Sequence, residues 1–319
     1  MNILICRTDK LGDFITALPA IYVLKHYNTQ NKIIVCVAPL NRALAESCDF
    51  IDEVVVDSGQ SLWNLASAIR TCKIDASIAL FSNTRIAITL LLAGISKRIA
   101  PATKIAQIFY TQRVLQRRSE VKMAEFEYNL ELTKALFSHI NLEYKKPLLE
   151  FTDSKTVYDI FRINNDIEKE VIAFHVGFGG SSDANWNLDE YEILIREVLR
   201  QKRYQVVLTF GPDEKELYEE MQSRFIDEGV VFYLSLDGLI YFAKLISSFK
   251  LFVSTSTGTY HLASLVGCPT MTFFGDSLFA SSKRWKSLGE EKLQQHFMLP
   301  QDKTKRDKIF EEVKKKLLL

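Results

Sequence analysis

The sequence predicts an α/β protein made of two parallel-sheet domains. Short apolar runs alternate with helical stretches along the chain at intervals of roughly 20–30 residues, which is typical of parallel sheets covered by helices on both faces. The 319 residues fit two domains of about 150 residues each. Apolar residues make up 47% and charged residues 25%, as in ordinary globular proteins. The net charge of +1 gives no indication of a nucleic-acid partner.

The pattern in the first half of the sequence predicts one such series of strands and helices. The expected strands are Asn2–Cys6, Ile33–Ala38, Glu53–Val56 and Asp75–Phe81. A helix is expected from Phe14 to Leu24, with Pro19 in its early turns, where proline is tolerated best. Further helices are expected at Leu62–Arg70, Thr84–Ala93, Lys104–Gln116 and Glu125–His139.

A polar, charged stretch from Asn141 to Asp166 separates this series from a second one, and we expect the interdomain linker there. The second series predicts strands at Val171–His175, Gln205–Phe210, Val230–Tyr233, Leu251–Val253 and Thr270–Phe274. Its helices are expected at Leu188–Arg200, Glu214–Phe225, Leu239–Ser247, from His261, and at Asp302–Leu318. The predicted domains are 1–150 and 151–300, followed by a final helix at 301–319.

The second series is organised around Leu251–Cys268, in which a buried strand passes into a helix through Ser256, Thr257, Gly258 and Thr259. Hydroxyl groups and a glycine at this point leave backbone N–H groups available at a helix N-terminus, which suits a phosphate or diphosphate. An ordinary helix N-cap is the alternative. His261 is one turn into the helix, where it either contacts a ligand or serves packing.

Two other loops follow strands of the same domain. One contains Gly177, Gly179, Gly180, Ser181 and Ser182, and the other contains Gly211. Glycines and serines let a backbone approach a ligand closely and present its N–H groups. A mobile loop would explain either cluster alone, whereas three such turns in one domain favour a pocket for a nucleoside diphosphate.

The first loop of the chain, RTDKLGD, also follows a strand. Its only glycine is Gly12, so it lacks the dinucleotide-binding fingerprint, and a dehydrogenase is not expected. Asp13 is a candidate general base, with Arg7 and Lys10 beside it as candidate phosphate ligands. A plain N-cap also explains Asp13, and spacing alone favours that explanation.

The segment from Arg85 to Lys122 carries eight basic residues against one acid, Glu120. Such a segment attracts an acidic ligand or a membrane surface, although a solvated helix face would have the same composition. The five cysteines are scattered without a CxxC pair, which fits a reducing cytoplasm and indicates neither disulfides nor zinc. The longest apolar run, Ile86–Ile95, is too short to span a bilayer, and the N-terminus has no signal-peptide pattern. We therefore expect a cytoplasmic protein.

Three stretches resemble the lipopolysaccharide heptosyltransferases of glycosyltransferase family 9. They are ILICRTDKLGDFITALPAIYVLK, FHVGFGGSSDANWNLDEYEIL and VSTSTGTYHLASLVGCPTMTFFG. The resemblance covers essentially the whole chain, with the motifs in the family's order, and indicates a bacterial enzyme.

The resemblance implies a GT-B architecture of two Rossmann-like domains facing across a cleft. The N-terminal domain would bind the acceptor, the C-terminal domain the nucleotide sugar, and the final helix would pack back on the N-terminal domain. The implied reaction is inverting and needs no metal or cofactor, with Asp13 as the general base. Ser181, Ser182, Gly211, Ser256, Thr257, Gly258, Thr259 and His261 would bind the donor diphosphate, with Gly12 and Asn185 near the donor sugar. An ADP-sugar is the favoured donor.

The basic segment then becomes an expected contact for a glycolipid or other acidic glycan acceptor, with a peripheral position at the inner membrane face. The expected acceptor-binding residues are Arg7, Lys10, Arg85, Arg113, Arg117 and Arg118. Two positions depart from the family: Ser256 replaces an aspartate and Ala184 replaces a lysine, both near the donor sugar. A donor sugar other than heptose, an acceptor in capsule or protein, and a non-catalytic nucleotide-binding module remain alternatives.

Overall fold

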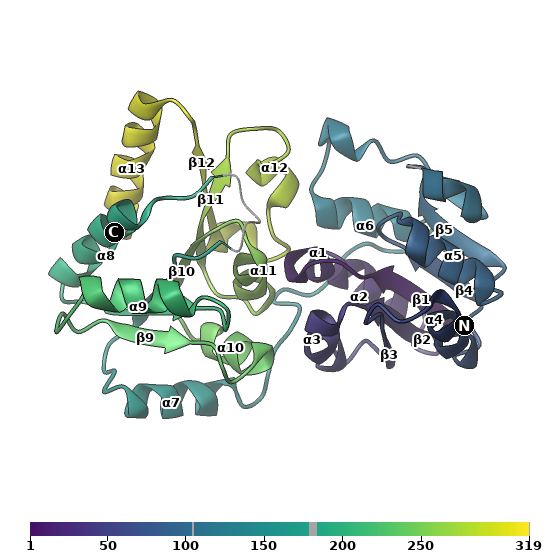
Figure 1. Ribbon diagram of the computed structural model, residues 1–319, viewed down its shortest axis with the longest axis horizontal. Helices are drawn as coiled ribbons and strands as arrows, with labels where there is room; N and C mark the ends of the chain where they lie inside the picture. Colours follow the sequence, from purple (N-terminus) through teal and green to yellow (C-terminus); the bar gives the residue numbers. More distant parts are fainter. Residues whose placement is uncertain (104, 179–183, 319) are drawn as a thin grey trace. The chain divides into compact units, whose positions relative to one another are not determined.

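The computed structural model describes residues 1–103, 105–178 and 184–318. The chain forms two compact units, Met1–Lys145 and Lys146–Leu319, each with its own sheet (Figure 1).

The sheet of the first unit is entirely parallel. Its order is β3-β2-β1-β4-β5-β6, and its register pairs Ile3 with Ile33 and with Ala76. The strands are β1 (Asn2–Arg7), β2 (Lys32–Val37), β3 (Glu53–Val56), β4 (Ala76–Ala79), β5 (Lys97–Pro101) and β6 (Gln112–Val114). This is the Rossmann order, in which the chain reverses direction across the sheet between β1 and β4 and leaves a ligand-binding crevice at their carboxyl ends.

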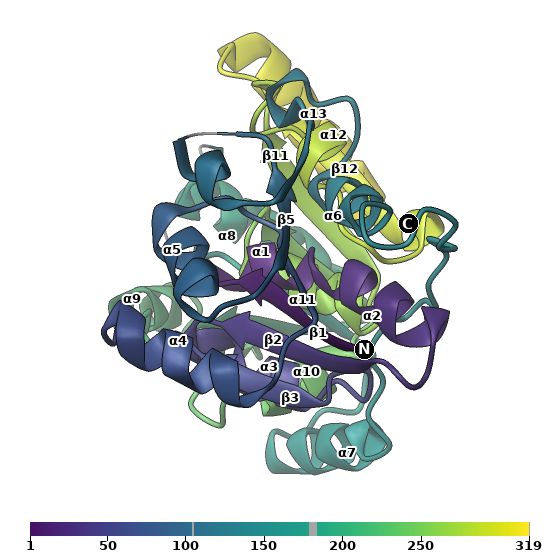
Figure 2. The same cartoon turned by 90° about the vertical axis from the view of Figure 1, so that its right-hand side faces the viewer.

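Helices cover both faces of this sheet. They are α1 (Leu11–Ile15), α2 (Leu18–Tyr27), α3 (Arg42–Glu46), α4 (Leu62–Thr71), α5 (Thr84–Leu92) and α6 (Glu125–Thr133), with 3₁₀ turns η1 (Pro39–Asn41), η2 (Ile105–Phe109) and η3 (Arg118–Glu120). Figure 2 shows α4 and α5 on one side of the strands and α2 and α6 on the other. The single helix predicted from Phe14 is two helices, because Pro19 lies in the first turn of α2, where its missing N–H costs nothing.

The helix predicted at Lys104–Gln116 is wrong. The structure has η2 followed by the edge strand β6. The reason is a tertiary partner: the N–H of Thr111 donates to Arg98 O at 2.9 Å, and the N–H of Ala102 donates to Val114 O at 2.7 Å. Pairing with β5 therefore uses backbone groups that a helix would need. Neither β5 nor β6 was predicted.

The sheet of the second unit repeats the same architecture, with the order β12-β11-β10-β7-β8-β9 and parallel pairing throughout. Its strands are β7 (Val171–His175), β8 (Gln205–Phe210), β9 (Val231–Leu234), β10 (Leu251–Thr255), β11 (Thr270–Gly275) and β12 (Gln294–Leu299). The order reverses between β7 and β10. The prediction of two Rossmann-like parallel sheets is confirmed, although β12 was missed.

The helices of this unit are α7 (Ser154–Asn164), α8 (Leu188–Arg200), α9 (Lys215–Arg224), α10 (Leu239–Ile246), α11 (Gly258–Leu265), α12 (Ser282–Trp285) and α13 (Lys303–Leu317), with the 3₁₀ turn η4 (Glu291–Leu293). The segment predicted as a linker contains α7, which packs on α10 and buries Phe161 against Tyr233. The boundary between the units, at Lys145 and Lys146, lies within the predicted segment, but α7 was missed because one buried aromatic residue in a charged stretch gives a weak sequence pattern. Helix α13 contacts α8 and β12 and buries Val313 and Leu317 in the core of its own unit.

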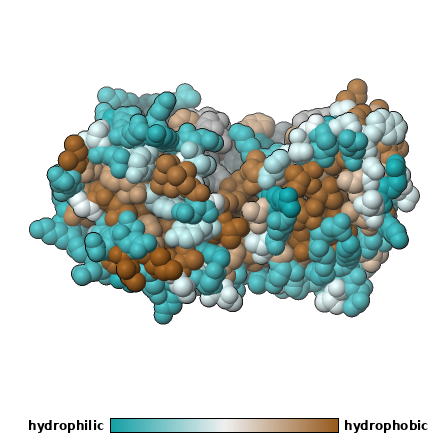
Figure 3. Space-filling model, turned by 60° about the horizontal axis from the view of Figure 1, so that its bottom comes forward, coloured by the Kyte–Doolittle hydropathy of each residue, from teal (hydrophilic) through white to brown (hydrophobic). Residues whose placement is uncertain are grey.

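The central strands are almost completely buried, as parallel strands covered on both faces must be. Apolar patches remain at the surface, and Figure 3 shows several among hydrophilic side chains on the face that carries α7. Within the described residues, no helix is both long and apolar enough to cross a membrane.

Candidate active site

Polar loops follow the strands at the crevice of each sheet. In the second unit these loops follow β7 and β10, and in the first unit they follow β1 and β4. Parallel sheets of this order bind ligands at these carboxyl ends. We therefore expect the ligand-binding and catalytic residues of each unit in these loops.

The loop after β10 presents the N-terminus of α11. Thr257 is the N-cap residue, but its side chain accepts no capping hydrogen bond, and its Oγ1 lies 2.8 Å from Oγ1 of Thr259. The first-turn N–H groups, beginning at Gly258, are thus not capped by the Thr257 side chain. N–H groups without such a cap and the helix dipole favour an anion.

The loop that follows β7 returns to β10 at Ala184. The hydroxyl of Thr255 donates to Ala184 O at 2.7 Å, which ties the end of this loop to the residue that precedes Ser256 in the chain. Asn185 Nδ2 donates to Val176 O at 3.1 Å, and its Oδ1 accepts from the Tyr191 hydroxyl at 2.8 Å. Asn185 thereby closes the base of the loop. The predicted ligands Ser181 and Ser182 lie outside the described residues.

His261 is buried in α11, with Nδ1 3.2 Å from the Ser287 hydroxyl. Burial, together with the positive charge that His296 would carry, lowers the pKa of His261 to about 3. The imidazole is therefore neutral at physiological pH. The neutral ring has Nδ1 beside the Ser287 hydroxyl, which can either donate to it or accept from it. The sequence did not reveal this contact, because Ser287 lies in a later loop.

A second polar cluster lies at the ends of β7 and β8. The N–H of Gly211 donates to Glu214 Oε2 at 2.7 Å, and the same oxygen lies 3.8 Å from Nε2 of the buried His175. Burial lowers the pKa of His175, an effect that the Glu214 charge opposes. The predicted diphosphate ligand Gly211 thus gives its N–H to a carboxylate in this structure. A Cβ on Gly177 would lie 1.9 Å from Glu214 Oε1, so this glycine makes room for the carboxylate.

In the first unit, Asp13 is held by Arg7. Its Oδ1 accepts from Arg7 Nη2 at 2.5 Å, and Arg7 Nε donates to Asp9 at 2.8 Å. Lys10 is the N-cap of α1, Gly12 lies in the first turn, and Asp13 follows it. Asp13 is therefore not the N-cap that spacing favoured. Its side chain is 21% exposed, which leaves it accessible to a substrate.

Arg7 is 3% exposed and neutralises several acids. Burial alone would lower the pKa of its guanidinium, but the charges of Asp9, Asp13 and Glu125 outweigh burial and raise the pKa. Glu125, on α6, lies 3.5 Å from Arg7 Nη1 and 2.5 Å from Arg118 Nη1. The role of Glu125 was missed, because it lies far from Arg7 in the sequence.

The predicted acceptor-binding arginines fall into two groups. Arg85 pairs with Asp57 at 2.7 Å and Arg118 pairs with Glu125, so both have structural partners. Arg113 and Arg117 are exposed, and Arg117 lies 3.3 Å from Glu120. Of these four arginines, Arg85 and Arg118 therefore have charges that are already paired with acids of the first unit.

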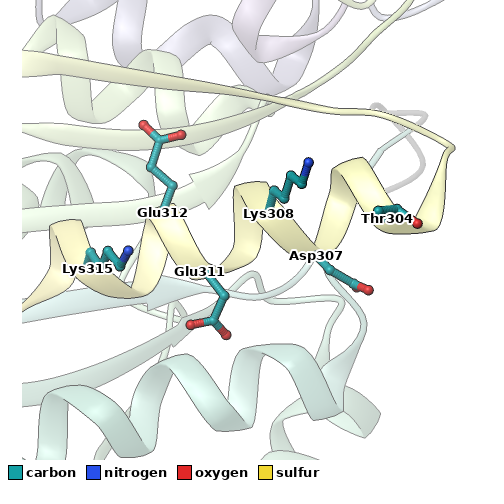
Figure 4. Close-up of a pocket in the computed structure, with 6 residues that line it drawn as sticks. All are labelled: Thr304, Asp307, Lys308, Glu311, Glu312 and Lys315. Carbon is teal, nitrogen blue, oxygen red and sulfur yellow. The ribbon is translucent and has the colours of Figure 1, made fainter.

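A shallow pocket lies along α13, lined by Thr304, Asp307, Lys308, Glu311, Glu312 and Lys315. Figure 4 shows Lys308 and Glu312 on one side of the helix and Asp307 and Glu311 on the other. This pocket contains no predicted site residue. Among the described side chains, no group of three or more His, Cys, Asp or Glu could hold a metal ion.

Residues 62–314 match the model of glycosyltransferase family 9 (heptosyltransferase). A Haemophilus influenzae protein named "Putative glycosyltransferase" is 36% identical over 300 residues, which cover 91% of this chain and 86% of that protein. The chain belongs to glycosyltransferase family 9. The prediction of a glycosyltransferase is thereby confirmed.

Solved structures agree with the fold of this family 9 glycosyltransferase. The Escherichia coli ADP-heptose lps heptosyltransferase II has a TM-score of 0.82 at 19% identity and covers 100% of this chain and 99% of its own. The E. coli heptosyltransferase WaaC with ADP has a TM-score of 0.73 at 17% identity, covering 98% and 100%. A family 9 glycosyl transferase from Veillonella parvula has a TM-score of 0.76 at 17% identity, covering 98% and 89%.

Proposed function

We propose that this family 9 glycosyltransferase transfers a sugar from a nucleoside-diphosphate sugar to a hydroxyl group of an acidic, glycolipid-type acceptor. The observation that carries the proposal is the N-terminus of α11, where Thr257 leaves the first-turn N–H groups without a side-chain cap. These groups would stabilise the negative charge that develops on the leaving diphosphate. The neutral His261 on the same helix would add a hydrogen bond to that group.

Asp13 is the proposed general base on the acceptor side. Its carboxylate is partly exposed, and its position is fixed by the 2.5 Å hydrogen bond from Arg7. It would accept the proton of the acceptor hydroxyl as the oxygen attacks the anomeric carbon and the nucleoside diphosphate leaves. A single in-line displacement of this kind inverts the anomeric configuration. We propose that the reaction uses no metal and no separate cofactor.

An ADP-sugar is the proposed donor, and heptose or a related sugar is the proposed group transferred. Support comes from family membership and from relatives of the same fold, one of which is described with ADP. The acceptor proposed on the same grounds is of the lipopolysaccharide-core type.

A different donor sugar is the alternative, and one observation favours it. Ala184 and Ser256 are the two departures from the family's usual residues. The Thr255 hydroxyl donates to Ala184 O at 2.7 Å, and Thr255 directly precedes Ser256, so both departures lie near the carboxyl end of β10. Changes at both positions favour a changed sugar preference.

Thermal melting with ADP, UDP, GDP, CDP and NAD in turn tests the donor. A ligand at about 100 times its Kd stabilises the folded protein by about 2.7 kcal/mol, which raises the Tm by several degrees. A shift with ADP supports the main proposal, and a shift with UDP or GDP supports the alternative donor. If no diphosphate shifts the Tm, the proposed donor site is wrong.

The Asp13→Asn variant tests the base. We expect a fall in turnover of about 10²- to 10⁴-fold, the usual contribution of a positioned base, with an unchanged Tm shift from the diphosphate. Retained turnover would show that Asp13 is not the base. If the wild type binds a diphosphate but transfers no sugar, a non-catalytic binding module is indicated instead. Turnover that persists in excess EDTA is expected, and its loss would refute the metal-independent mechanism.

A further inference from the structure

One edge of the first unit exposes large aliphatic side chains that are not part of the hydrophobic core. Ile105 and Ile108 of η2 are 76% and 64% exposed, and Leu115, next to β6, is 72% exposed. Single exposed apolar residues are normal at protein surfaces, whereas a group of them at one place indicates an interaction.

The exposure of η2 is not the result of a loose turn. Ala106 and Tyr110 are buried in the core beside α5, and Arg98 Nε donates to Phe109 O at 2.8 Å. In a 3₁₀ helix, side chains three residues apart lie one above the other. Ile105 and Ile108 therefore project together from a turn that is fixed to the sheet on its inner side.

Leu115 lies close to the start of this turn. The hydrogen bond from Ala102 N to Val114 O joins the chain just before Leu115 to the chain that leads into η2. Strand β6 is the last strand of the sheet, so its outer edge has no neighbouring strand. The three aliphatic side chains thus belong to one surface, which we name the η2–β6 surface: Ile105, Ile108, Leu115 and the cations Arg113 and Arg117.

Arg113 and Arg117 give this surface a positive charge. Arg113 is exposed and makes no ion pair within the described part of the chain. It precedes Leu115 by two residues, and alternate residues of an extended chain point to the same side. Arg117 is 67% exposed, with Glu120 as its partner. Exposed aliphatic groups beside arginines match the interface of an anionic bilayer, in which apolar side chains enter the acyl boundary and cations bind headgroups.

We propose that the η2–β6 surface docks the enzyme on a membrane that contains anionic lipids. Leu115 directly follows β6, and Asp13 lies in the helix that follows β1, so both belong to the carboxyl-end side of the same parallel sheet. Docking there would bring a lipid-linked acceptor to the Asp13 end of the sheet. The docking itself follows from the surface alone, and only this delivery of acceptor rests on the proposed function.

Co-sedimentation of the full chain with vesicles tests the proposal. Vesicles of phosphatidylcholine alone are compared with vesicles that contain about one-third phosphatidylglycerol, at low and at high salt. We expect binding to the anionic vesicles that weakens with salt. The double variant Ile105→Gln/Ile108→Gln should bind about tenfold more weakly or worse. Arg113→Gln should lose about fivefold.

Matched controls remove equivalent groups elsewhere on the same unit. Leu40→Gln/Trp63→Gln replaces two apolar side chains that are 54% and 67% exposed, and Arg42→Gln replaces an exposed arginine. These controls should bind like the wild type. Absence of binding to anionic vesicles, equal binding to both vesicle types, or equal losses in controls and test variants would each overturn the proposal. A dimer that is lost in Ile105→Gln/Ile108→Gln would overturn it in favour of a second copy of the chain.

Two further results separate docking from catalysis. The Asp13→Asn variant should bind vesicles as the wild type does, because docking does not use the base. Ile105→Gln/Ile108→Gln should keep wild-type turnover on a water-soluble acceptor and lose it on an acceptor embedded in vesicles. Loss of turnover on both acceptors would show that these residues support the fold rather than membrane docking.

Discussion

Replacing Arg7 by methionine removes the guanidinium from a buried group of charges. Arg7 lies 2.8 Å from Asp9, 2.5 Å from Asp13 and 3.5 Å from Glu125, and is itself 3% exposed. Methionine retains the length and the apolar character of the side-chain stem, so the main loss is electrostatic. Breaking a buried ion pair costs about 3–5 kcal/mol, because a charge is left uncompensated.

The structure argues for a loss at or just below the lower end of that range. Asp9 and Asp13 are 28% and 21% exposed, so water screens part of their charge, and Arg118 still neutralises Glu125. We therefore expect Arg7→Met to lower the free energy of unfolding at pH 7 by about 2–3 kcal/mol.

The loss should depend on pH with a definite sign. Burial raises the pKa of Asp9 even though Arg7 opposes this effect, so removing Arg7 raises that pKa further. A carboxyl group whose pKa is higher in the folded state opposes folding above its unfolded pKa of about 4, where it must ionise. The deficit of Arg7→Met should be full at pH 7 and smaller at pH 4.5.

Urea unfolding at both pH values measures the loss, and hydrogen exchange followed by mass spectrometry locates it. Protection should fall in β1 and α6 and stay unchanged in the second unit. Arg42→Met is the matched control, since the pair of Arg42 with Glu46 is exposed and should contribute less than about 0.5 kcal/mol. If Arg7→Met does not fold, Arg7→Lys keeps a cation and should show a smaller deficit. A loss for Arg7→Met no larger than that of Arg42→Met would refute the reasoning.

Three further predictions concern the second unit. Gly177→Ala places a Cβ 1.9 Å from Glu214 Oε1, so the carboxylate must move and give up its hydrogen bond from the N–H of Gly211. We expect a loss of about 1 kcal/mol in urea unfolding. Gly211→Ala, whose Cβ would meet nothing closer than 3.5 Å, should cost less, and equal costs would contradict the contact. Thr255→Val removes the hydroxyl that donates to Ala184 O in the loop after β7; it should lower the free energy of unfolding by about 1–2 kcal/mol and raise the KM for the donor. Thr270→Val is the control: it removes a buried hydroxyl that has no partner among the described residues, and it should leave stability unchanged or increase it. Burial lowers the pKa of His261 to about 3, so the unfolded state takes up a proton at this residue as the pH falls through 6.5, before the folded state does. The free energy of unfolding should therefore drop by about 2 kcal/mol by pH 5 on account of this residue. His261→Asn should reduce the dependence of the unfolding free energy on pH, measured by urea unfolding at several pH values.

The sequence located most of the second unit without help from tertiary structure. Strands such as Val171–His175 and Gln205–Phe210 and the helix Leu188–Arg200 agree with the structure residue for residue. The two strands are almost continuously buried runs and the helix is amphipathic, so local patterns of apolar residues specify all three. The segment around Ile105 was misread because its apolar spacing suits a helix, whereas pairing with β5 decided its structure.

The sequence predicted only part of the candidate site. It singled out the hydroxyl-rich turn at Ser256–Thr259 and the acid Asp13, because polar residues between a predicted strand and a predicted helix form a pattern that is visible within a few residues. The partners of those residues were not found. Ser287 beside His261 and Glu125 beside Arg7 are supplied by other elements, and no local pattern identifies them.

The sequence by itself determined the fold class, the family resemblance and the loops that carry polar groups, because each depends on residues that are neighbours in the chain. Only the tertiary structure decided the order of the strands and the outer edges at β6 and β12, since strand pairing depends on distant partners. It also decided that Ala184 accepts a hydrogen bond from Thr255, a contact that spans 71 residues. Such contacts form when the carboxyl ends of parallel strands meet at one edge of a sheet, which is a property of the assembled sheet and not of any segment.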